Sequence, residues 1–256
     1  MHILEEKIVA ARKAGRMALI PFVTAGFPSR ERFWGVIREL DASGADIIEI
    51  GVPFSDPVAD GPVVEAASMR ALESGVSLAG IMEELAAHKG EVSAGIVLMG
   101  YMNPFLQYGL ERFAREAAEA GVNGVIVPDL PFEEAAPMRE TLRAQGLALI
   151  PLVGPNTSAE RMALYAEVSE GYAYVVSVMG TTGVRNALPP EVPEVLARAH
   201  SVFRLPVALG FGLKGPAQLD AIPEAIRPDA AVFGSSLLRH LDAGGSPQSF
   251  MEVWTA

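Results

Sequence analysis

Two carboxylic acids, Glu49 and Asp60, stand at either end of a short, stiff stretch of the chain. Glu49 lies in the apolar run Asp46–Ile50, which has the composition of a buried strand. Asp60 closes the proline-rich segment V-P-F-S-D-P-V-A-D that follows at 52–60. A strand that carries one acid and a stiff loop that carries another can present both to one pocket. A pair of carboxyl groups in a pocket can perform general acid–base catalysis.

The place of Glu49 in its strand decides which way the side chain points. Side chains alternate across a strand, so Glu49 shares a face with Ile47, while Ile48 and Ile50 share the other. The residue is either a proton-transfer group or a buried carboxylate paired with a Lys or Arg. No predicted strand contains Lys or Arg, so such a partner would have to come from a loop. We expect Glu49 to be catalytic and burial to raise its pKa.

Asp60 and Asp56 each admit two interpretations. Asp60 precedes Gly61-Pro62 and a predicted helix, where aspartate is a favoured N-cap residue. The residues alone therefore leave helix capping and catalysis open for Asp60. Asp56, in the middle of the proline-rich loop, is predicted either to shape a turn or to contact something outside the chain.

Three glycine-rich turns in the last third of the chain could hold an anion. They are Gly180-Thr181-Thr182-Gly183, Gly210-Phe211-Gly212 and Gly234-Ser235-Ser236. Glycine lets backbone N–H groups approach phosphate oxygens, and a helix N-terminus attracts negative charge. The chain has a net charge of −11 and no basic cluster, so we expect these amides to bind a phosphate monoester. The segment 177–190 around the first turn is predicted to act as a lid.

The elements that position these residues are eight short apolar runs separated by segments of helical periodicity. The predicted strands are Leu19–Val23, Asp46–Ile50, Gly95–Met99, Gly124–Val127, Ala148–Leu152, Ala173–Val176, Pro206–Leu209 and Ala230–Phe233. Helical patterns cover residues 30–43, 63–74, 78–89, 110–120, 133–144 and 158–168. The three glycine-rich turns follow the last three strands.

Eight strands alternating with helices predict an α/β fold of the (β/α)8 TIM-barrel type. An open doubly wound sheet is the alternative, but the turn after the first strand, Thr24–Pro28, lacks its glycine fingerprint. The chain shows no linker, so we expect residues 1–256 to form a single domain with an extra N-terminal helix within residues 1–15.

Composition excludes several other classes of protein. There is no basic face for nucleic acid, no cysteine for a disulfide or thiolate site, and no run of 18 apolar residues for a membrane span. The four histidines are predicted to lie at the surface and lack metal-ligand spacing, so no metal is expected. The charged first segment is unlike a secretory signal, and we expect a cytoplasmic protein.

Residues that are missing from the predicted strands and loops argue against two further types of enzyme mechanism. Ser55 has no G-x-S-x-G setting, so a hydrolase triad is unsupported. No lysine lies on a predicted strand, which argues against Schiff-base aldolase chemistry. A retro-aldol cleavage or an isomerisation driven by acids alone remains open.

Eight segments of the chain closely resemble the α-subunit family of tryptophan synthase. They are I-P-F-V-T-A-G-F-P at 20–28, D-I-I-E-I-G-V-P-F-S-D-P-V-A-D-G-P at 46–62, Y-M-N-P at 101–104, V-P-D-L-P at 127–131, G-Y-A-Y at 171–174, G-T-T-G at 180–183, G-F-G at 210–212 and F-G-S-S at 233–236. They occur in order over nearly the whole chain, and the second is specific enough to identify the family alone.

The resemblance implies cleavage of indole-3-glycerol phosphate to indole and glyceraldehyde 3-phosphate, as part of tryptophan biosynthesis. It assigns general acid–base catalysis to Glu49, stabilisation of charge on the indole nitrogen to Asp60, and a place beside the catalytic acid to Tyr174. It also implies apolar walls around the indole, phosphate contacts, and a threonine that closes on Asp60. These substrate-binding residues are Phe22, Met99, Leu152, Phe211 and Val232 for the walls, Gly183, Gly212, Gly234 and Ser235 for the phosphate, and Thr182 for the lid.

The resemblance further implies a partner, a β subunit that contains pyridoxal phosphate, in an αββα assembly through which indole passes. The docking surface would include Asp56, Asn103, Pro104 and Phe105, and this chain itself would need no cofactor. In the predicted lid, Val178 and Met179 stand where some members of the family carry more polar residues. This difference affects the expectation of lid closure and not that of the chemistry. The alternatives are another phosphate-binding barrel enzyme, such as an isomerase of phosphorylated sugars or anthranilates, and a non-catalytic regulatory subunit.

Overall fold

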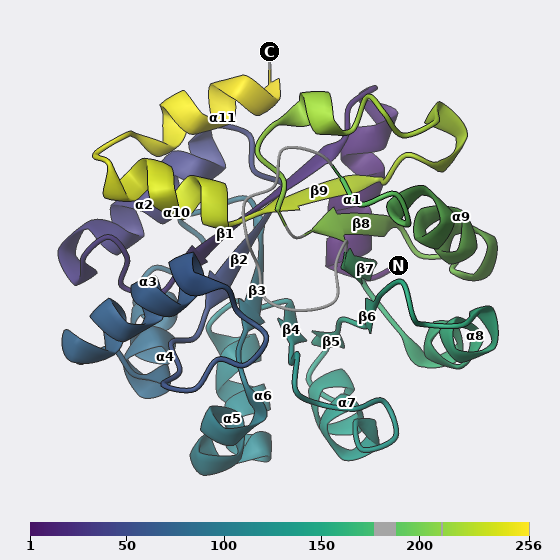
Figure 1. Cartoon of the computed structure of the whole chain (residues 1–256). Helices are drawn as coiled ribbons and strands as arrows, with labels where there is room; N and C mark the ends of the chain where they lie inside the picture. Colours follow the sequence, from purple (N-terminus) through teal and green to yellow (C-terminus); the bar gives the residue numbers. More distant parts are fainter. Residues whose placement is uncertain (177–187, 211, 256) are drawn as a thin grey trace.

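The computed structural model describes residues 1–176, 188–210 and 212–255. Parallel strands form a ring and helices surround it (Figure 1). The strands are β1 Ala18–Thr24, β2 Ile47–Gly51, β3 Gly95–Met99, β4 Gly124–Ile126, β5 Ala148–Leu149, β6 Leu152–Val153, β7 Ala173–Val176, β8 Val207–Gly210 and β9 Ala230–Phe233. Their order in the sheet is β5-β4-β3-β2-β1-β9-β8-β7-β6.

The two ends of this order belong to one stretch of chain, which closes the barrel. The fifth strand lies where it was predicted, but the prediction of one continuous strand is wrong, because the segment is broken into β5 and β6. The Ile150 N–H donates to the Val125 carbonyl at 2.9 Å, and the Tyr174 N–H donates to the Pro151 carbonyl at 3.0 Å. The segment therefore bonds to β4 on one side and β7 on the other. Pro151 has no N–H to add to the ladder, which explains the break. The predicted TIM barrel is confirmed.

The helices pack around the outside of the barrel, except α1, which covers one of its ends. They are α1 Ile3–Lys13, α2 Arg30–Ala42, α3 Pro62–Glu73, α4 Leu78–Ala87, α5 Met102–Tyr108, α6 Leu110–Glu119, α7 Ala136–Arg143, α8 Ala159–Val168, α9 Val192–Val202, α10 Ser235–Asp242 and α11 Pro247–Thr255. None of the helices in the described parts of the chain is long and apolar enough to cross a membrane.

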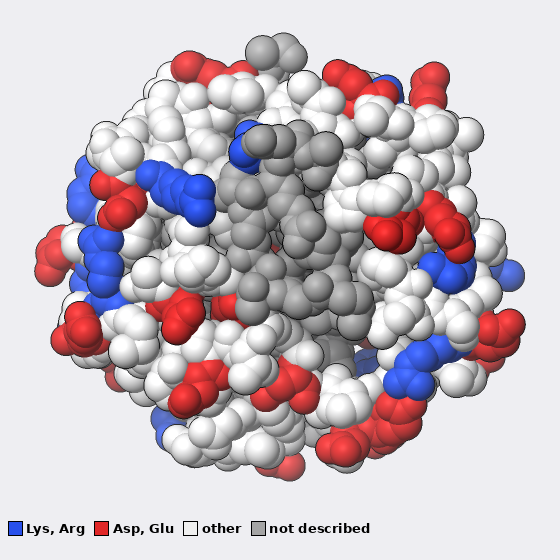
Figure 2. Space-filling view, viewed as in Figure 1, with Lys and Arg blue, Asp and Glu red and all other residues white. Residues whose placement is uncertain are grey.

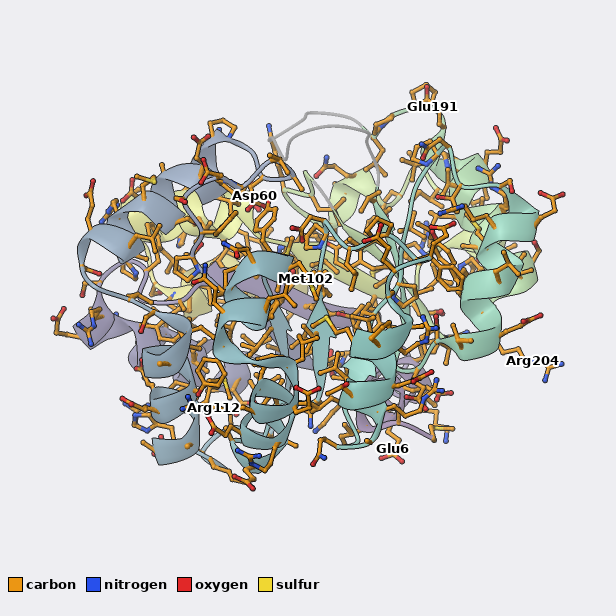
Figure 3. The ribbon with its side chains drawn as sticks, turned by 90° about the horizontal axis from the view of Figure 1, so that it is seen from below. Glu6, Asp60, Met102, Arg112, Glu191 and Arg204 are labelled. Atoms are coloured by element: carbon orange, nitrogen blue, oxygen red, sulfur yellow. The ribbon has the colours of Figure 1, made fainter. Side chains whose placement is uncertain are left out.

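Helix α1 packs against the N-terminal ends of the strands. Its Leu4 is fully buried and lies so close to Gly95 and Gly124, which begin β3 and β4, that a Cβ on either glycine would come within 3.0 Å of it. Glu6 of α1 and Asp60 lie at opposite ends of the barrel in the side view of Figure 3. The helix thus covers one end and leaves the carboxyl ends of the strands, where barrel enzymes bind their ligands, for the site.

Candidate active site

Glu49 points into the barrel, as the alternation along its strand predicts. Its same-face neighbour Ile47 belongs to the interior apolar cluster, whereas Ile48 and Ile50 pack on the helix side. The residue is 1% exposed, and its Oε2 has no hydrogen-bond partner among the described residues. Burial, and then the charge of Asp60, raises its pKa to about 8. The alternative of a carboxylate neutralised by Lys or Arg does not hold, because such a partner would lower the pKa.

Asp60 reaches the same pocket from the loop after β2. Burial raises its pKa to about 6, a hydrogen bond from Tyr101 acts in the opposite direction, and the charge of Glu65 adds to the increase. Helix α3 has Gly61 as its N-cap and no side-chain cap hydrogen bond, so the capping interpretation of Asp60 is wrong. Near neutral pH, Asp60 is therefore mostly ionised while Glu49 is mostly protonated.

Tyr101 holds Asp60 in place, and the motifs did not single it out for this role. Its hydroxyl donates to the Asp60 carboxylate and accepts from the Ala59 N–H at 2.9 Å. Its ring stacks on Phe54 with centroids 5.1 Å apart. Tyr101 lies two residues after the end of β3, at the carboxyl end of the barrel, and this position was the signal that could have found it. Asp60 thereby gains a donor that favours its ionised form.

We expect Tyr101→Phe to raise the pKa of Asp60 above its present value of about 6, since the variant removes a hydrogen bond that stabilises the carboxylate. Activity that depends on ionised Asp60 should then appear only at higher pH. The measurement is the acidic limb of the pH profile of kcat/KM. Tyr165→Phe, on the outer helix α8, is the matched control and should leave that limb in place.

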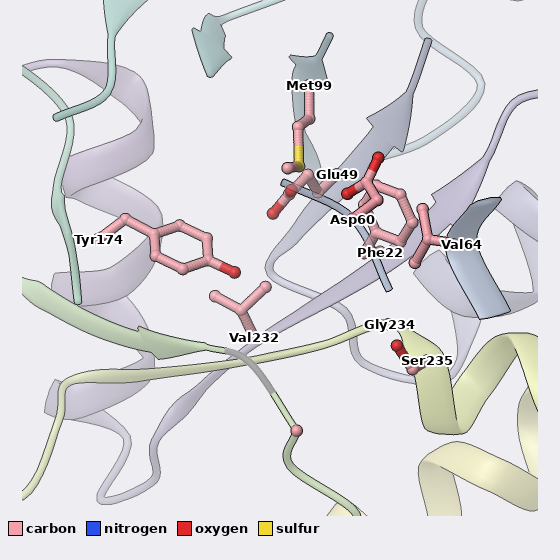
Figure 4. Close-up of a pocket in the computed structure, with 10 residues that line it drawn as sticks. Phe22, Glu49, Asp60, Val64, Met99, Tyr174, Val232, Gly234 and Ser235 are labelled. Carbon is pink, nitrogen blue, oxygen red and sulfur yellow. The ribbon is translucent and has the colours of Figure 1, made fainter. Parts of the chain in front are cut away.

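Tyr174 and four apolar side chains complete the pocket. The Tyr174 hydroxyl and the carboxyl groups of Glu49 and Asp60 point into one space (Figure 4). Burial, followed by the charge of Glu49, raises the pKa of Tyr174 well above its ordinary value, so the hydroxyl stays neutral. Phe22, Met99, Val232 and Val64 supply the walls. Val64, on the first turn of α3, was not predicted from the sequence.

The opposite end of the pocket is built from backbone. Gly212, Gly234 and Ser235 line it, and α10 begins at Ser235 with Gly234 as its N-cap. The first N–H groups of a helix have no acceptor within it and attract an anion. A Cβ on Gly234 would lie 2.8 Å from the Phe22 ring, so this position requires glycine. The loops after β8 and β9 thus place backbone donors across from the two acids.

Some predicted binding residues lie elsewhere or outside the described residues. Leu152 packs toward the barrel interior but lines a separate hollow between α7 and α8. Thr182, Gly183 and Phe211 lie outside the described residues, as does most of the predicted lid. The structure therefore brings together both acids, Tyr174, three of the five predicted wall residues and three of the four predicted phosphate contacts.

The predicted docking surface is present in part. Asp56 and Asn103 are exposed and Pro104 is half-buried. Phe105 is fully buried and packs on Phe113 with ring centroids 4.6 Å apart, so its inclusion in the surface is wrong. Helical spacing explains the error, because consecutive residues of α5 face different directions. Val58 and Leu106 are instead the exposed apolar residues of this region, at 78% and 55%.

The charges on one face of the molecule are mixed, and the described residues show no metal site. Basic side chains lie beside acidic ones on the face seen in Figure 2. His88 contacts Glu91 at 2.8 Å, a pairing that the sequence did not predict. In the described part of the chain, no three His, Cys, Asp or Glu residues are grouped to bind a metal ion.

Comparison of the sequence with known proteins identifies the family of this chain. A sequence profile described as "Tryptophan synthase alpha chain" matches residues 8–252. The chain belongs to the tryptophan synthase alpha chain family. A relative of that name from Desulfovibrio desulfuricans is 66% identical over 254 residues, covering 99% of this chain and 100% of its own. One from Nitratidesulfovibrio vulgaris is 64% identical over 251 residues, covering 98% and 97%.

Solved structures of the tryptophan synthase alpha chain family share the fold. A chain of Mycobacterium tuberculosis tryptophan synthase superimposes with a TM-score of 0.89 at 35% identity, covering 98% of this chain and 95% of that one. Tryptophan synthase subunit alpha from Legionella pneumophila gives a TM-score of 0.84 at 32% identity, covering 98% and 94%. As a member of this family the chain is a lyase of tryptophan biosynthesis that cleaves indole-3-glycerol phosphate to indole and glyceraldehyde 3-phosphate. An isomerase or a non-catalytic subunit is thereby excluded.

Proposed function

We propose that Glu49 and Asp60 are the catalytic pair of this cleavage. The observation that carries the proposal is that burial raises both pKa values, to about 8 and about 6, in one pocket. Glu49 then holds a proton near neutral pH while Asp60 is a carboxylate. Groups whose pKa values differ in this way can act as acid and as charge stabiliser at the same pH.

The reaction assigns a separate task to each group. Glu49 gives a proton to indole C3, the bond from C3 to the glycerol chain breaks, and indole leaves. The hydroxyl on the released carbon loses its proton and becomes the aldehyde, and Glu49 takes this proton back. Asp60 stabilises the positive charge that develops on the indole nitrogen during protonation. Tyr174 stays neutral and contacts the bound substrate beside Glu49, with no cofactor needed in this chain.

The substrate is oriented by its two ends. Phe22, Met99 and Val232 surround the indole, and the backbone of Gly212, Gly234 and Ser235 holds the phosphate. Thr182, Gly183 and Phe211 are proposed to complete these contacts, as the resemblance implies. Holding the phosphate at this backbone end of the same pocket would fix C3 next to Glu49.

We expect Ser235→Asp to raise KM for indole-3-glycerol phosphate by about 100-fold, because the new carboxylate repels the phosphate at the start of α10. A change of this kind should affect kcat much less than KM. The measurement is steady-state indole release. Ser201→Asp, exposed on α9, introduces the same charge away from the pocket and should leave KM unchanged. Equal KM values for Ser235→Asp and the parent chain would contradict the phosphate assignment.

We further propose that the partner is a pyridoxal-phosphate-containing β subunit in an αββα assembly, and that both act in the cytoplasm. The surface around Asp56, Asn103 and Pro104, with exposed Val58 and Leu106, is the docking site. Contact there would reach Asp60 through Phe54, which stacks on Tyr101. We treat residues 1–256 as one domain that docks as a unit.

Indole release with and without added β subunit tests the partner. We expect the β subunit to accelerate release, and Val58→Asp to raise the β concentration needed for half-maximal acceleration by at least tenfold, since it places a charge in an apolar contact. Release without β should stay unchanged in this variant. Val253→Asp is the control, because Val253 is 55% exposed on α11. If both variants needed the same β concentration for half-maximal acceleration, the docking site would have to lie elsewhere on the surface.

A further inference from the structure

A second hollow opens between α7 and α8, at the barrel wall. It lies where the wall is broken between β5 and β6, and Figure 2 shows a depression with basic atoms inside it over the gap between these helices in Figure 1. Its cavity volume is about 230 Å³. It shares no lining residue with the pocket of Glu49 and Asp60.

The walls of this hollow favour a flat apolar body. Leu130, Leu149 and Val168 line it, and the rings of Phe132 and Tyr165 stack beside them with centroids 4.4 Å apart. Stacked rings at a pocket edge offer faces and edges to a further ring. The lining also includes Pro128, Pro131 and Pro151, which have no N–H to donate. The backbone of this part of the wall therefore offers few hydrogen-bond donors.

Two guanidinium groups line the hollow, and only one has an acid partner among the described residues. Arg161 contacts Glu133 at 2.8 Å and donates to the Tyr165 hydroxyl at 3.0 Å. Arg139 is half-buried and lies 5.5 Å from the centre of the Phe132 ring, with no acid contact in the described part of the chain. Arg139 is thus a half-buried cation without an acid partner among the described residues, which suits it to an anionic ligand.

We propose that the hollow between α7 and α8 is a second ligand site, which takes a small aromatic carboxylate. The ring of the ligand lies against Leu149, Val168 and the stacked pair, and its carboxylate accepts hydrogen bonds from Arg139. Arg139 presents a planar set of donors that matches a carboxylate. The ligand is neither substrate nor product of the cleavage, because the site has no carboxyl pair and is separate from the catalytic pocket.

The test uses phenylacetate as the probe and measures its binding to the full chain by ligand-detected NMR titration. Glycerol 3-phosphate is present throughout to occupy the catalytic pocket. We expect saturable binding with Kd on the order of 1 mM. The neutral phenylacetamide, which has the same shape, should bind about tenfold more weakly because it lacks the charge that pairs with Arg139.

Two variants locate the probe within the molecule. Arg139→Gln should weaken phenylacetate binding about tenfold and leave phenylacetamide unchanged. Val168→Phe should fill the hollow and abolish binding of both. Arg115→Gln, exposed on α6, is the matched control and should bind like the parent chain. The proposal is overturned if the parent chain shows no saturable binding, if Arg139→Gln binds phenylacetate as the parent does, or if raising glycerol 3-phosphate displaces the probe.

Discussion

Glu49→Gln is expected to lower kcat for indole release by about 10³-fold, the range typical of a lost general acid. Glutamine has nearly the same size and cannot give a proton to indole C3. The interior position of Glu49, 1% exposed, means that water does not replace it easily. KM should change little, because the phosphate and indole contacts remain. The measurement is indole release under single-turnover conditions.

Two controls separate lost chemistry from lost structure in this variant. Binding of glycerol 3-phosphate should survive, since its contacts lie at the other end of the pocket. Glu65→Gln, one turn into α3 and exposed, removes a nearby acid outside the pocket and should retain the parent kcat. Unchanged turnover in Glu49→Gln would remove Glu49 from the mechanism.

The same variant should change how stability depends on pH. The folded pKa of Glu49, about 8, exceeds its ordinary value of 4.5, so the folded state keeps a proton that the unfolded state releases in between. The contribution of neutral Glu49 to the free energy of unfolding is full below pH 4.5 and is lost as pH rises to about 8. Glutamine does not titrate, so its free energy of unfolding lacks this loss. Relative to the parent, the variant should therefore gain on the order of 3 kcal/mol in free energy of unfolding between low pH and pH 7. Urea unfolding at pH 5 and pH 8 measures this difference.

Asp60→Asn is expected to lower kcat/KM by about 10²-fold to 10³-fold, because a neutral amide no longer stabilises positive charge on the indole nitrogen. Asparagine keeps the shape of the side chain, and its carbonyl oxygen can still accept from the Tyr101 hydroxyl. Gly61, not Asp60, caps α3, so the helix should be unaffected. The measurement is kcat/KM against pH together with the melting temperature.

The pH profile provides the decisive comparison for Asp60. The parent chain should lose activity below about pH 6 as Asp60 takes a proton, and Asp60→Asn should lack this limb. Glu65→Gln should move the limb to lower pH, because the charge of Glu65 raises the pKa of Asp60. A lower melting temperature with near-normal activity in Asp60→Asn would show that the side chain is structural.

The sequence by itself determined the architecture and the direction of Glu49. The recurrence of apolar runs and helical segments predicted eight barrel positions, and alternation along the second strand predicted an inward acid. These are local properties, since they depend on residues close together in the chain. The glycine-rich turns after β8 and β9 were found for the same reason, because glycines directly after an apolar run are visible in consecutive residues.

Only the tertiary structure decided how the acids behave. The raised pKa values of Glu49 and Asp60 depend on burial, which distant segments create together, and on nearby charges, that of Asp60 for Glu49 and that of Glu65 for Asp60. The hydrogen bond from Tyr101 to Asp60 joins the ends of β3 and the loop after β2. Burial of Phe105 and the hollow beside Arg139 likewise arise where separate helices meet. Desolvation and pair distances are set by the packing of the whole chain, so no local pattern contains them.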